Sequence, residues 1–125
     1  MSYEPHELTI VLEGVRPPSW NQIYMGVHWS KRKRLVDEAH WLTRLALPED
    51  YEIFTSPVDI TITSYFSTRP LDCDNIAAKL YIDGLCGYVL EDDSPRYVSS
   101  VTTKSRIDKK NPRVEIKLRA TKSYE

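Results

Sequence analysis

The feature that most constrains the fold of this chain is a nine-residue segment near its middle, from Val58 to Phe66. Apolar side chains occupy every second position of the segment, with Ile60 and Ile62 at its centre and Ser64 as the one polar member of the series. Successive side chains of a strand point to opposite faces, so this alternation predicts a strand with one buried surface. Such a strand requires a sheet around it and a second layer that covers its apolar face.

Three other segments predict further strands. Glu7–Glu13 alternates loosely around a β-branched centre, and the prolines at 17–18 prevent it from continuing. Arg96–Arg106 and Arg113–Arg119 predict two more strands, joined by a turn at Asp108–Pro112. The sheet is therefore expected to contain about four strands.

Two segments have the pattern of helices. The first is expected from Lys31 to Leu47, with Ser30 as its N-cap and Pro48 just beyond its end. Its expected apolar stripe consists of Leu35, His40 and Trp41, Leu42, Leu45 and Ala46. The second helix is expected to begin at Asp72 or Asp74 as its cap and to run to about Leu85.

The resulting order, β-α-β-α-β-β, predicts an α+β fold in which one mixed sheet of about four strands packs with two helices. A chain of 125 residues fits a single domain spanning residues 1–125. No apolar run approaches the roughly 20 residues that a membrane span needs. Two cysteines without a metal-binding spacing, Cys73 and Cys86, are typical of a cytoplasmic protein with free thiols.

Acidic residues crowd into two short segments, Asp72-Cys73-Asp74-Asn75 and Glu91-Asp92-Asp93. Carboxylates this close repel one another, and a divalent cation with a preference for oxygen ligands would neutralise them. In extended backbone, positions 72 and 74 face the same side, so both carboxylates could reach one ion. The alternative is that Asp72 and Asp74 only cap a helix while residues 92–95 form a turn.

Charge is unevenly distributed, although the formal net charge is only −1. Residues 71–95 hold six acidic residues and one basic residue, Lys79, and residues 31–34 read Lys-Arg-Lys-Arg. Residues 99–125 hold eight basic residues: Lys104, Arg106, Lys109, Lys110, Arg113, Lys117, Arg119 and Lys122. An acidic centre between basic segments suits a metal-loaded pocket on a phosphate-binding surface. The alternative is that the basic side chains only solvate exposed strands and a helix.

Two smaller features have two readings each. Lys79 and Asp83 are four residues apart, so they either form an ion pair along a helix or leave Lys79 to contact a phosphate. The aromatic residues Trp20, Tyr24 and Trp29 lie near the basic run, where they either stack on nucleobases or pack within the protein.

Several motifs, taken together and in this order, resemble the RusA family of Holliday junction resolvases. They are Pro17-Pro18-Ser19-Trp20-Asn21, Asp72-Cys73-Asp74-Asn75-Ile76, Asp83-Gly84-Leu85 and Asp92-Asp93. The resemblance covers about residues 7–120. It implies a RusA-like fold and a small endonuclease of the type found in phages and prophages.

The resemblance also implies the site residues. The acidic triad of the family falls on Asp72, Asp74 and Asp93, which would hold Mg²⁺ or Mn²⁺, and its catalytic lysine falls on Lys79. Counted from Asn75, Lys79 lies one residue later than in the family pattern; counted back from Asp83, it fits. The family acts as a homodimer on four-way DNA junctions and hydrolyses phosphodiester bonds in recombination and repair.

Two other functions remain open at this point. One is a metal-dependent nuclease with a different DNA preference, such as forks or flaps. The other is a non-catalytic DNA-binding module whose acidic cluster is structural. For a dimer, the apolar positions of Val58–Phe66 and the helix that begins near Lys31 are both possible interfaces.

Overall fold

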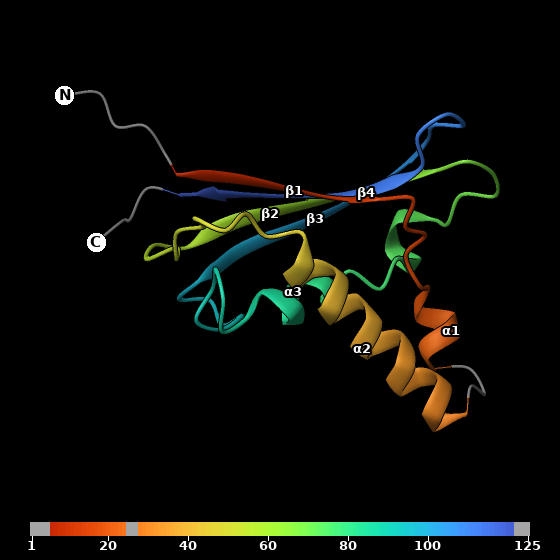
Figure 1. Ribbon diagram of the computed structural model, residues 1–125, viewed down its shortest axis with the longest axis horizontal. Coiled ribbons are helices and arrows are strands. Elements are labelled where there is room, and N and C mark those ends of the chain that lie inside the picture. Colours follow the sequence, from red (N-terminus) through yellow and green to blue (C-terminus); the bar gives the residue numbers. More distant parts are fainter. Residues whose placement is uncertain (1–5, 25–27, 122–125) are drawn as a thin grey trace.

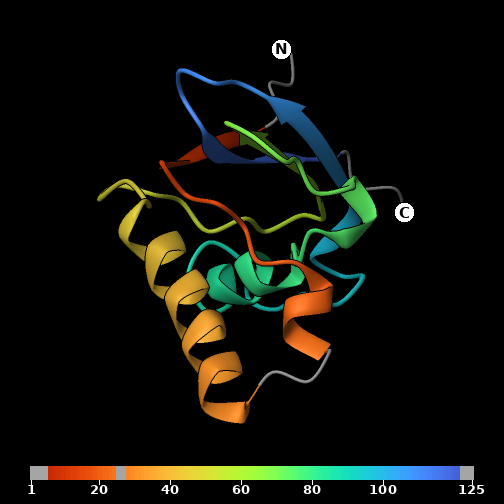
Figure 2. The same ribbon diagram turned by 90° about the vertical axis from the view of Figure 1, so that its right-hand side faces the viewer.

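The computed structural model describes residues 6–24 and 28–121, which form two layers (Figures 1 and 2). One layer is a four-stranded sheet, and the other consists of helices that cover one of its faces. The predicted α+β class with one mixed sheet is confirmed. In the part of the chain that the structure describes, no helix combines the length and the apolar character that a membrane crossing requires.

The four predicted strands are present, with bounds that differ from the predicted ones by at most two residues. They are β1 (Glu7–Glu13), β2 (Val58–Phe66), β3 (Val98–Ile107) and β4 (Arg113–Ala120). Their order across the sheet is β1-β4-β2-β3. Strand β4 pairs antiparallel with both of its neighbours, whereas β2 and β3 are parallel. Strand β3 therefore forms one edge of the sheet, on the side where the acidic segments lie.

The face of β2 that alternation predicted to be apolar is fully buried, Ser64 included. It lies beside Val114, Ile116 and Leu118 of β4, and β4 in turn pairs with β1, whose Ile10 and Leu12 are also buried. The apolar positions of β2 are therefore core residues in an interior strand. The idea that they form a dimer interface is wrong.

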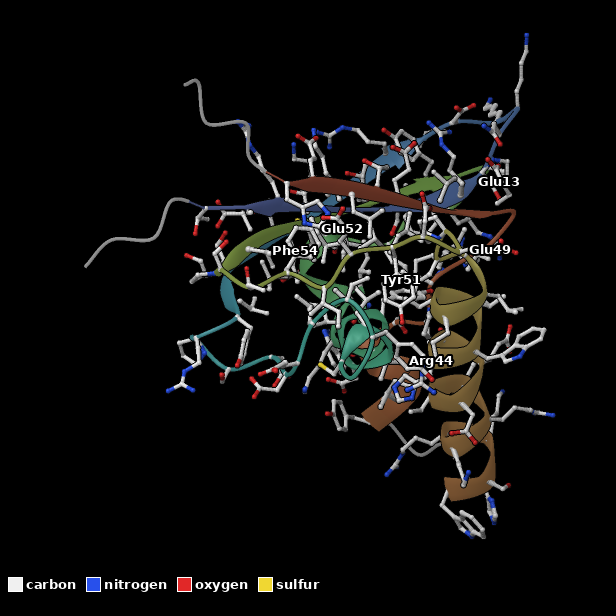
Figure 3. The ribbon with its side chains drawn as sticks, turned by 60° about the vertical axis from the view of Figure 1, so that its left-hand side comes forward. Glu13, Arg44, Glu49, Tyr51, Glu52 and Phe54 are labelled. Atoms are coloured by element: carbon white, nitrogen blue, oxygen red, sulfur yellow. The ribbon has the colours of Figure 1, made fainter. Side chains whose placement is uncertain are left out.

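The segment between helix α2 (Trp29–Leu45) and β2 contributes one large side chain to this core (Figure 3). Phe54 is 1% exposed, although it lies outside any helix or strand. Its ring stacks on that of His6 with 4.0 Å between ring centroids, and its backbone N–H donates to the Val89 carbonyl at 2.8 Å. The segment thus packs between His6, just before β1, and Val89, in the turn that follows helix α3 (Lys79–Leu85).

Helix α2 (Trp29–Leu45) begins and ends two residues earlier than predicted. His28, not Ser30, occupies the N-cap position, and its Nδ1 accepts from the Ser30 backbone N–H at 3.2 Å. The fully buried positions of the helix are Ala39 and Thr43, whereas Trp41 and Leu45 of the predicted stripe are exposed. The prediction of the stripe was therefore wrong in part.

Small residues lie on the inner side of α2 because α3 (Lys79–Leu85) approaches it closely. A Cβ atom at Gly84 would lie 3.1 Å from Cα of His40 and 3.3 Å from Cβ of Thr43. The Thr43 hydroxyl donates to the Ala39 carbonyl at 2.7 Å, which satisfies its polar group inside the contact. Arg44 extends across the contact and donates to the Gly84 carbonyl at 3.1 Å.

The second predicted helix is interrupted, so the prediction that it runs unbroken from Asp72 or Asp74 was wrong. A 3₁₀ turn, η1 (Cys73–Asn75), comes first, and α3 starts only at Lys79. Ile76 between them is extended and forms an antiparallel bridge with Ser19. Because this long-range pairing occupies the backbone at Ile76, the helix cannot continue through it.

A short helix that the sequence interpretation did not include, α1 (Trp20–Tyr24), precedes α2. Ser19 and Gln22 form a reciprocal capping box at its start. The Ser19 hydroxyl accepts from the Gln22 N–H at 3.0 Å, and the Gln22 side chain accepts from the Ser19 N–H at 2.9 Å. The Ser-x-x-Gln spacing was the signal that could have predicted this helix.

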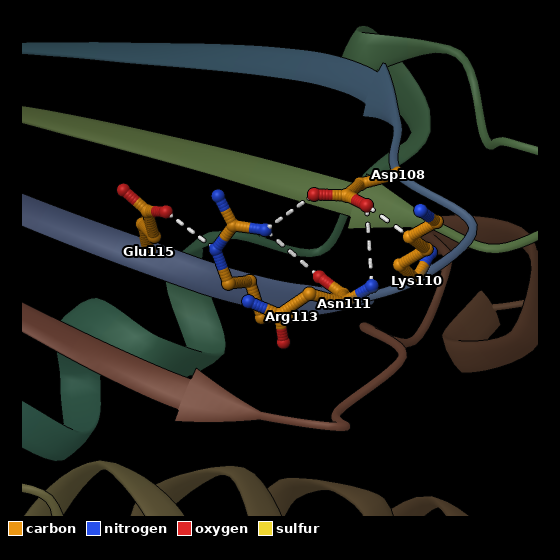
Figure 4. A network of polar contacts seen from close by, with 5 residues as sticks. All are labelled: Asp108, Lys110, Asn111, Arg113 and Glu115. Atoms are coloured by element: carbon orange, nitrogen blue, oxygen red, sulfur yellow. Dashed lines mark hydrogen bonds and ion pairs between the residues drawn. The ribbon is translucent and has the colours of Figure 1, made fainter.

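The turn between β3 and β4 is fixed by Arg113 (Figure 4). Its guanidinium pairs with Asp108 at 3.0 Å and with Glu115 at 2.6 Å, and it donates to the Asn111 carbonyl at 2.8 Å. It also lies over the ring of Tyr65, 3.8 Å from the ring centroid. The Arg113 guanidinium, through its hydrogen bond, holds the pKa of Asp108 below its usual value. Arg113 is thus a structural residue and does not belong to a free basic surface.

Candidate active site

A pocket of about 430 Å³ lies where α1, η1, α3 and the edge strand β3 meet. Its polar lining includes Asp74 from η1, Lys79 at the start of α3 and Asp93 from the loop before β3. Cys73 and Thr103 line it as well. We call it the acidic pocket. It joins three of the four residues that the resemblance singled out.

Lys79 is the central charged group of this pocket. Its Nζ atom donates to Oδ1 of Asp83 at 2.9 Å and to Oδ2 of Asp93 at 3.1 Å. The predicted pair along the helix is therefore present, but Lys79 also reaches a carboxylate fourteen residues away in sequence. All three side chains are partly exposed, so water screens these ion pairs.

The two hydrogen bonds, first to Asp83 and then to Asp93, raise the pKa of Lys79. A raised lysine pKa means that folding favours the charged form of the side chain. This contribution to stability is complete below the pKa of lysine in the unfolded chain, about 10.4, and is lost as the pH rises through the pKa in the folded protein. Lys79 thus stays cationic across the range in which enzymes are usually assayed. It can stabilise negative charge there, but it cannot act as a general base.

The two neighbouring aspartates at 92 and 93 have different surroundings. Asp93 lines the acidic pocket and pairs with Lys79. Asp92 accepts from the Ser94 N–H at 2.7 Å, and hydrogen bonds from Ser94 lower its pKa. Asp92 therefore stabilises the turn, in line with the alternative reading for residues 92–95, whereas Asp93 remains directed to the pocket.

The first two aspartates also differ from each other. Asp74, within η1, lines the acidic pocket, whereas Asp72 immediately precedes η1 in extended backbone and is not among the lining residues. The Asp72 side chain forms no capping hydrogen bond to the turn. Its carbonyl accepts from the Asn75 N–H at 2.9 Å. The expectation that residues 72 and 74 point the same way assumed extended backbone, and the 3₁₀ turn changes that geometry.

Two segments far away in sequence hold the loop that carries these acids. From β3, the Thr103 hydroxyl donates to the Cys73 carbonyl at 2.9 Å and the Ser105 hydroxyl to the Leu71 carbonyl at 2.6 Å. From the N-terminal segment, the Asn21 N–H donates to the Asn75 side chain at 3.3 Å. Sequence reasoning gave no role to Thr103 and Ser105, since single hydroxyl residues in a strand carry no recognisable pattern.

The N-terminal segment reaches the same place through its backbone. Ser19 bridges Ile76, and the Ala77 N–H donates to the Pro18 carbonyl at 3.0 Å. The motif Pro17–Asn21 and the motif Asp72–Ile76 are thus joined in space, although fifty residues lie between them in the chain. Trp20, from the first motif, forms part of the pocket wall.

The donors around the acidic pocket have the chemistry that Mg²⁺ or Mn²⁺ requires. Asp74 and Asp93 supply carboxylate oxygens, which hard cations prefer, and Asp72 is two residues before Asp74. Within residues 6–24 and 28–121, no three His, Cys, Asp or Glu side chains converge closely enough to form a complete metal cage. In this structure the Asp93 carboxylate pairs with the Lys79 ammonium, which is the one cationic group in the pocket lining.

The basic residues divide into free and paired groups. All four side chains at 31–34, on the first turns of α2, are exposed, and among the residues that the structure describes only Lys33 of the four forms an ion pair, with Asp37 at 2.6 Å. On the sheet, Lys117 pairs with Glu7 at 2.8 Å. Lys104 and Arg106 are exposed on β3, and Lys122 lies outside the described residues. The start of α2 and the edge of β3 therefore offer the basic surfaces.

No protein-family model matches this chain, and no curated protein matches it either. Function is therefore inferred from the residues of the acidic pocket and from the resemblance carried by its motifs.

Proposed function

We propose that this chain is a metal-dependent endonuclease that resolves four-way DNA junctions by hydrolysing phosphodiester bonds in recombination and repair, as a RusA-type enzyme does. The observation that carries the proposal is that Asp74, Lys79 and Asp93 line one pocket although they come from three separate segments. The bridge between residues 19 and 76 adds support, because it joins the two motifs on which the resemblance rests.

In this proposal Asp74 and Asp93, with Asp72 as the third carboxylate, hold Mg²⁺ or Mn²⁺. When bound, the cation would supply Lewis-acid stabilisation of the phosphate and would lower the pKa of a water ligand. Lys79 stays protonated and donates to a phosphate oxygen as negative charge develops on it. Asp83 and Asp93 hold the ammonium in position for this role.

Cleavage of matched DNA substrates in Mg²⁺ tests the proposed function. A mobile four-way junction, a flap and a linear duplex of equal length are compared at one salt concentration. Preferential cleavage of the junction, dependent on Mg²⁺ or Mn²⁺, is the expected result. Preferential cleavage of flaps would favour a nuclease of other preference, and binding without any cleavage would favour a DNA-binding module.

We also propose that the protein acts as a homodimer, because two opposing strands of a junction must be cut and a two-fold dimer presents two equal sites. With the β2 positions buried in the core, α2 is the candidate interface that remains, since Trp29 and Trp41 are exposed on it. Sedimentation at micromolar concentration should show a 29 kDa species, about twice the 14.5 kDa of one chain. A monomer alone, with and without junction DNA, would contradict this proposal.

If the basic start of α2 binds phosphates, the affinity for junction DNA should fall steeply with salt. Each phosphate contact contributes roughly 0.9 to the slope of log K against log salt on B-form DNA. Replacing Lys33 and Arg34 together with Ala should flatten the slope by up to about two units and weaken junction and duplex binding alike. Titrations between low and moderate salt measure the slope.

The variant Lys104→Ala/Arg106→Ala is the matched comparison, since it removes two exposed charges from β3. An unchanged slope for the α2 variant together with a flatter one for the β3 variant would move the DNA-binding surface to the sheet edge. Equal slopes for both variants and the wild type would mean that neither surface contacts phosphates.

A further inference from the structure

The acidic pocket has an apolar part that the proposed metal chemistry does not use. Six residues form it: Trp20, Ile76, Ala78, Ile82, Val98 and Val101. A volume of about 430 Å³ lies in the usual range of small-molecule sites. Carboxylates and apolar side chains thus share one pocket. A cation site needs only the carboxylates, so the apolar side chains are left without a role.

Trp20 gives this pocket an aromatic wall. Its indole ring stacks on the ring of Tyr24, with 5.6 Å between centroids and 15° between planes. Tyr24 does not line the pocket and is 69% exposed, so it supports the indole from outside. The capping box at Ser19 and the bridge to Ile76 fix the start of α1 and therefore the position of Trp20.

The charges of the pocket decide which part of a nucleotide it can receive. The apolar part of the pocket offers a phosphate no cationic partner, because the one cation of the lining, Lys79, is held beside Asp83 and Asp93. A nucleobase carries no net charge and has flat apolar faces, so it fits the apolar wall. With its base in the pocket, a nucleotide would keep its phosphate at the rim, beside Asp74 and Lys79.

We propose that the acidic pocket receives one nucleobase, unstacked from its DNA strand next to the phosphate that is cut, and that Trp20 stacks on it. This inference rests on the proposed function for the identity of the polymer. Stacking of a base on an aromatic side chain is worth about 1–3 kcal/mol, which offsets part of the cost of unstacking the base. Trp20 thereby acts as a positioning residue for the scissile phosphate.

The test uses a single-stranded oligonucleotide with 2-aminopurine at its centre, in Ca²⁺, and follows the fluorescence of the probe. Wild-type protein should quench the probe because the base stacks on Trp20. Trp20→Ala should abolish the quenching and weaken binding by about 5- to 150-fold, whereas Trp20→Phe should keep part of both. Ile53→Ala is the control, because Ile53 is also exposed but lies in the segment between α2 and β2, away from the pocket.

A second pair of variants keeps the test valid if Trp20→Ala does not fold. Val101→Met narrows the pocket from the exposed edge strand without adding an aromatic ring, and Val11→Met adds the same bulk at an exposed position of the other edge strand. Val101→Met should reduce quenching and affinity, and Val11→Met should change neither. Circular dichroism verifies the fold of each variant.

Several outcomes would overturn the inference. They are unchanged quenching in Trp20→Ala or Val101→Met, an equal loss in Ile53→Ala, or no binding of the oligonucleotide by the wild type. Loss of dimerisation in Trp20→Ala, without any quenching in the wild type, would assign the pocket to a second copy of the chain. Quenching without cleavage of any DNA in Mg²⁺ would refute the nuclease proposal alone, and cleavage without quenching would refute the base pocket alone.

Discussion

Replacement of Asp74 by Asn should abolish cleavage of a four-way junction in Mg²⁺ while leaving junction binding intact. The substitution keeps the volume of the side chain but removes the charge that would hold the cation. Loss of even a supporting partner of a metal ligand costs 10- to 100-fold, so loss of a ligand should cost more than about 100-fold. Binding should persist, because a carboxylate contributes no attraction to phosphate. Rates under single-turnover conditions and gel-shift affinities give the two quantities.

Asp92→Asn is the matched control for this prediction, and Asp93→Asn is its partner in the pocket. Asp93 lines the acidic pocket, whereas Asp92 accepts the Ser94 N–H in the adjacent turn. We therefore expect Asp93→Asn to be inactive and Asp92→Asn to cleave. Normal cleavage by Asp74→Asn would contradict the proposed metal site. An inactive Asp92→Asn together with an active Asp93→Asn would mean that Asp92, not Asp93, is the metal ligand.

Phe54→Ala should destabilise the fold by about 3–5 kcal/mol, the range measured when a large buried aromatic side chain is removed. Phe54 is 1% exposed, and its ring stacks on His6. A domain is typically stable by 5–15 kcal/mol, so this loss is a large fraction of the total. Equilibrium unfolding in urea, with an unchanged slope, measures it.

The neighbouring Ile53 supplies the control, since it is 57% exposed in the same segment. Ile53→Ala should change the free energy of unfolding by no more than about 0.5 kcal/mol. Equal effects at the two positions would mean that the packing of Phe54 does not anchor the segment between α2 and β2 to the core.

Regular patterns of side chains predicted the sheet well. In β2 and β4 every second side chain is buried, as the alternation of apolar residues in the sequence predicted. The predicted bounds of β2 match the observed ones. The prediction was weaker for α2, where the close contact of Gly84 with the helix at His40 and Thr43 leaves no room for a bulkier apolar residue at position 43. The spacing of apolar residues along a helix does not reveal which other element of the fold packs closely against it.

The candidate site was predicted in its composition but not in its geometry. Motif spacing brought attention to Asp74, Lys79 and Asp93, and these residues do share a pocket. The break at Ile76 could not be predicted, because the hydrogen-bonding partner of that backbone lies near residue 19. Local propensity describes neighbours in the chain, whereas the position of η1 depends on a contact across the fold.

The bridge between Ser19 and Ile76 has a consequence for the order in which the molecule assembles and comes apart. The sheet can form from β1, β2, β3 and β4 alone, but the wall of the acidic pocket is complete only when a loop of more than fifty residues closes onto η1. Helix α1 has only five residues and one buried side chain, Ile23. Such an element opens at a lower free energy than the core strands. We therefore expect the wall that α1 contributes to the pocket to open before the sheet does, so that the protein can keep its fold after its site has come apart.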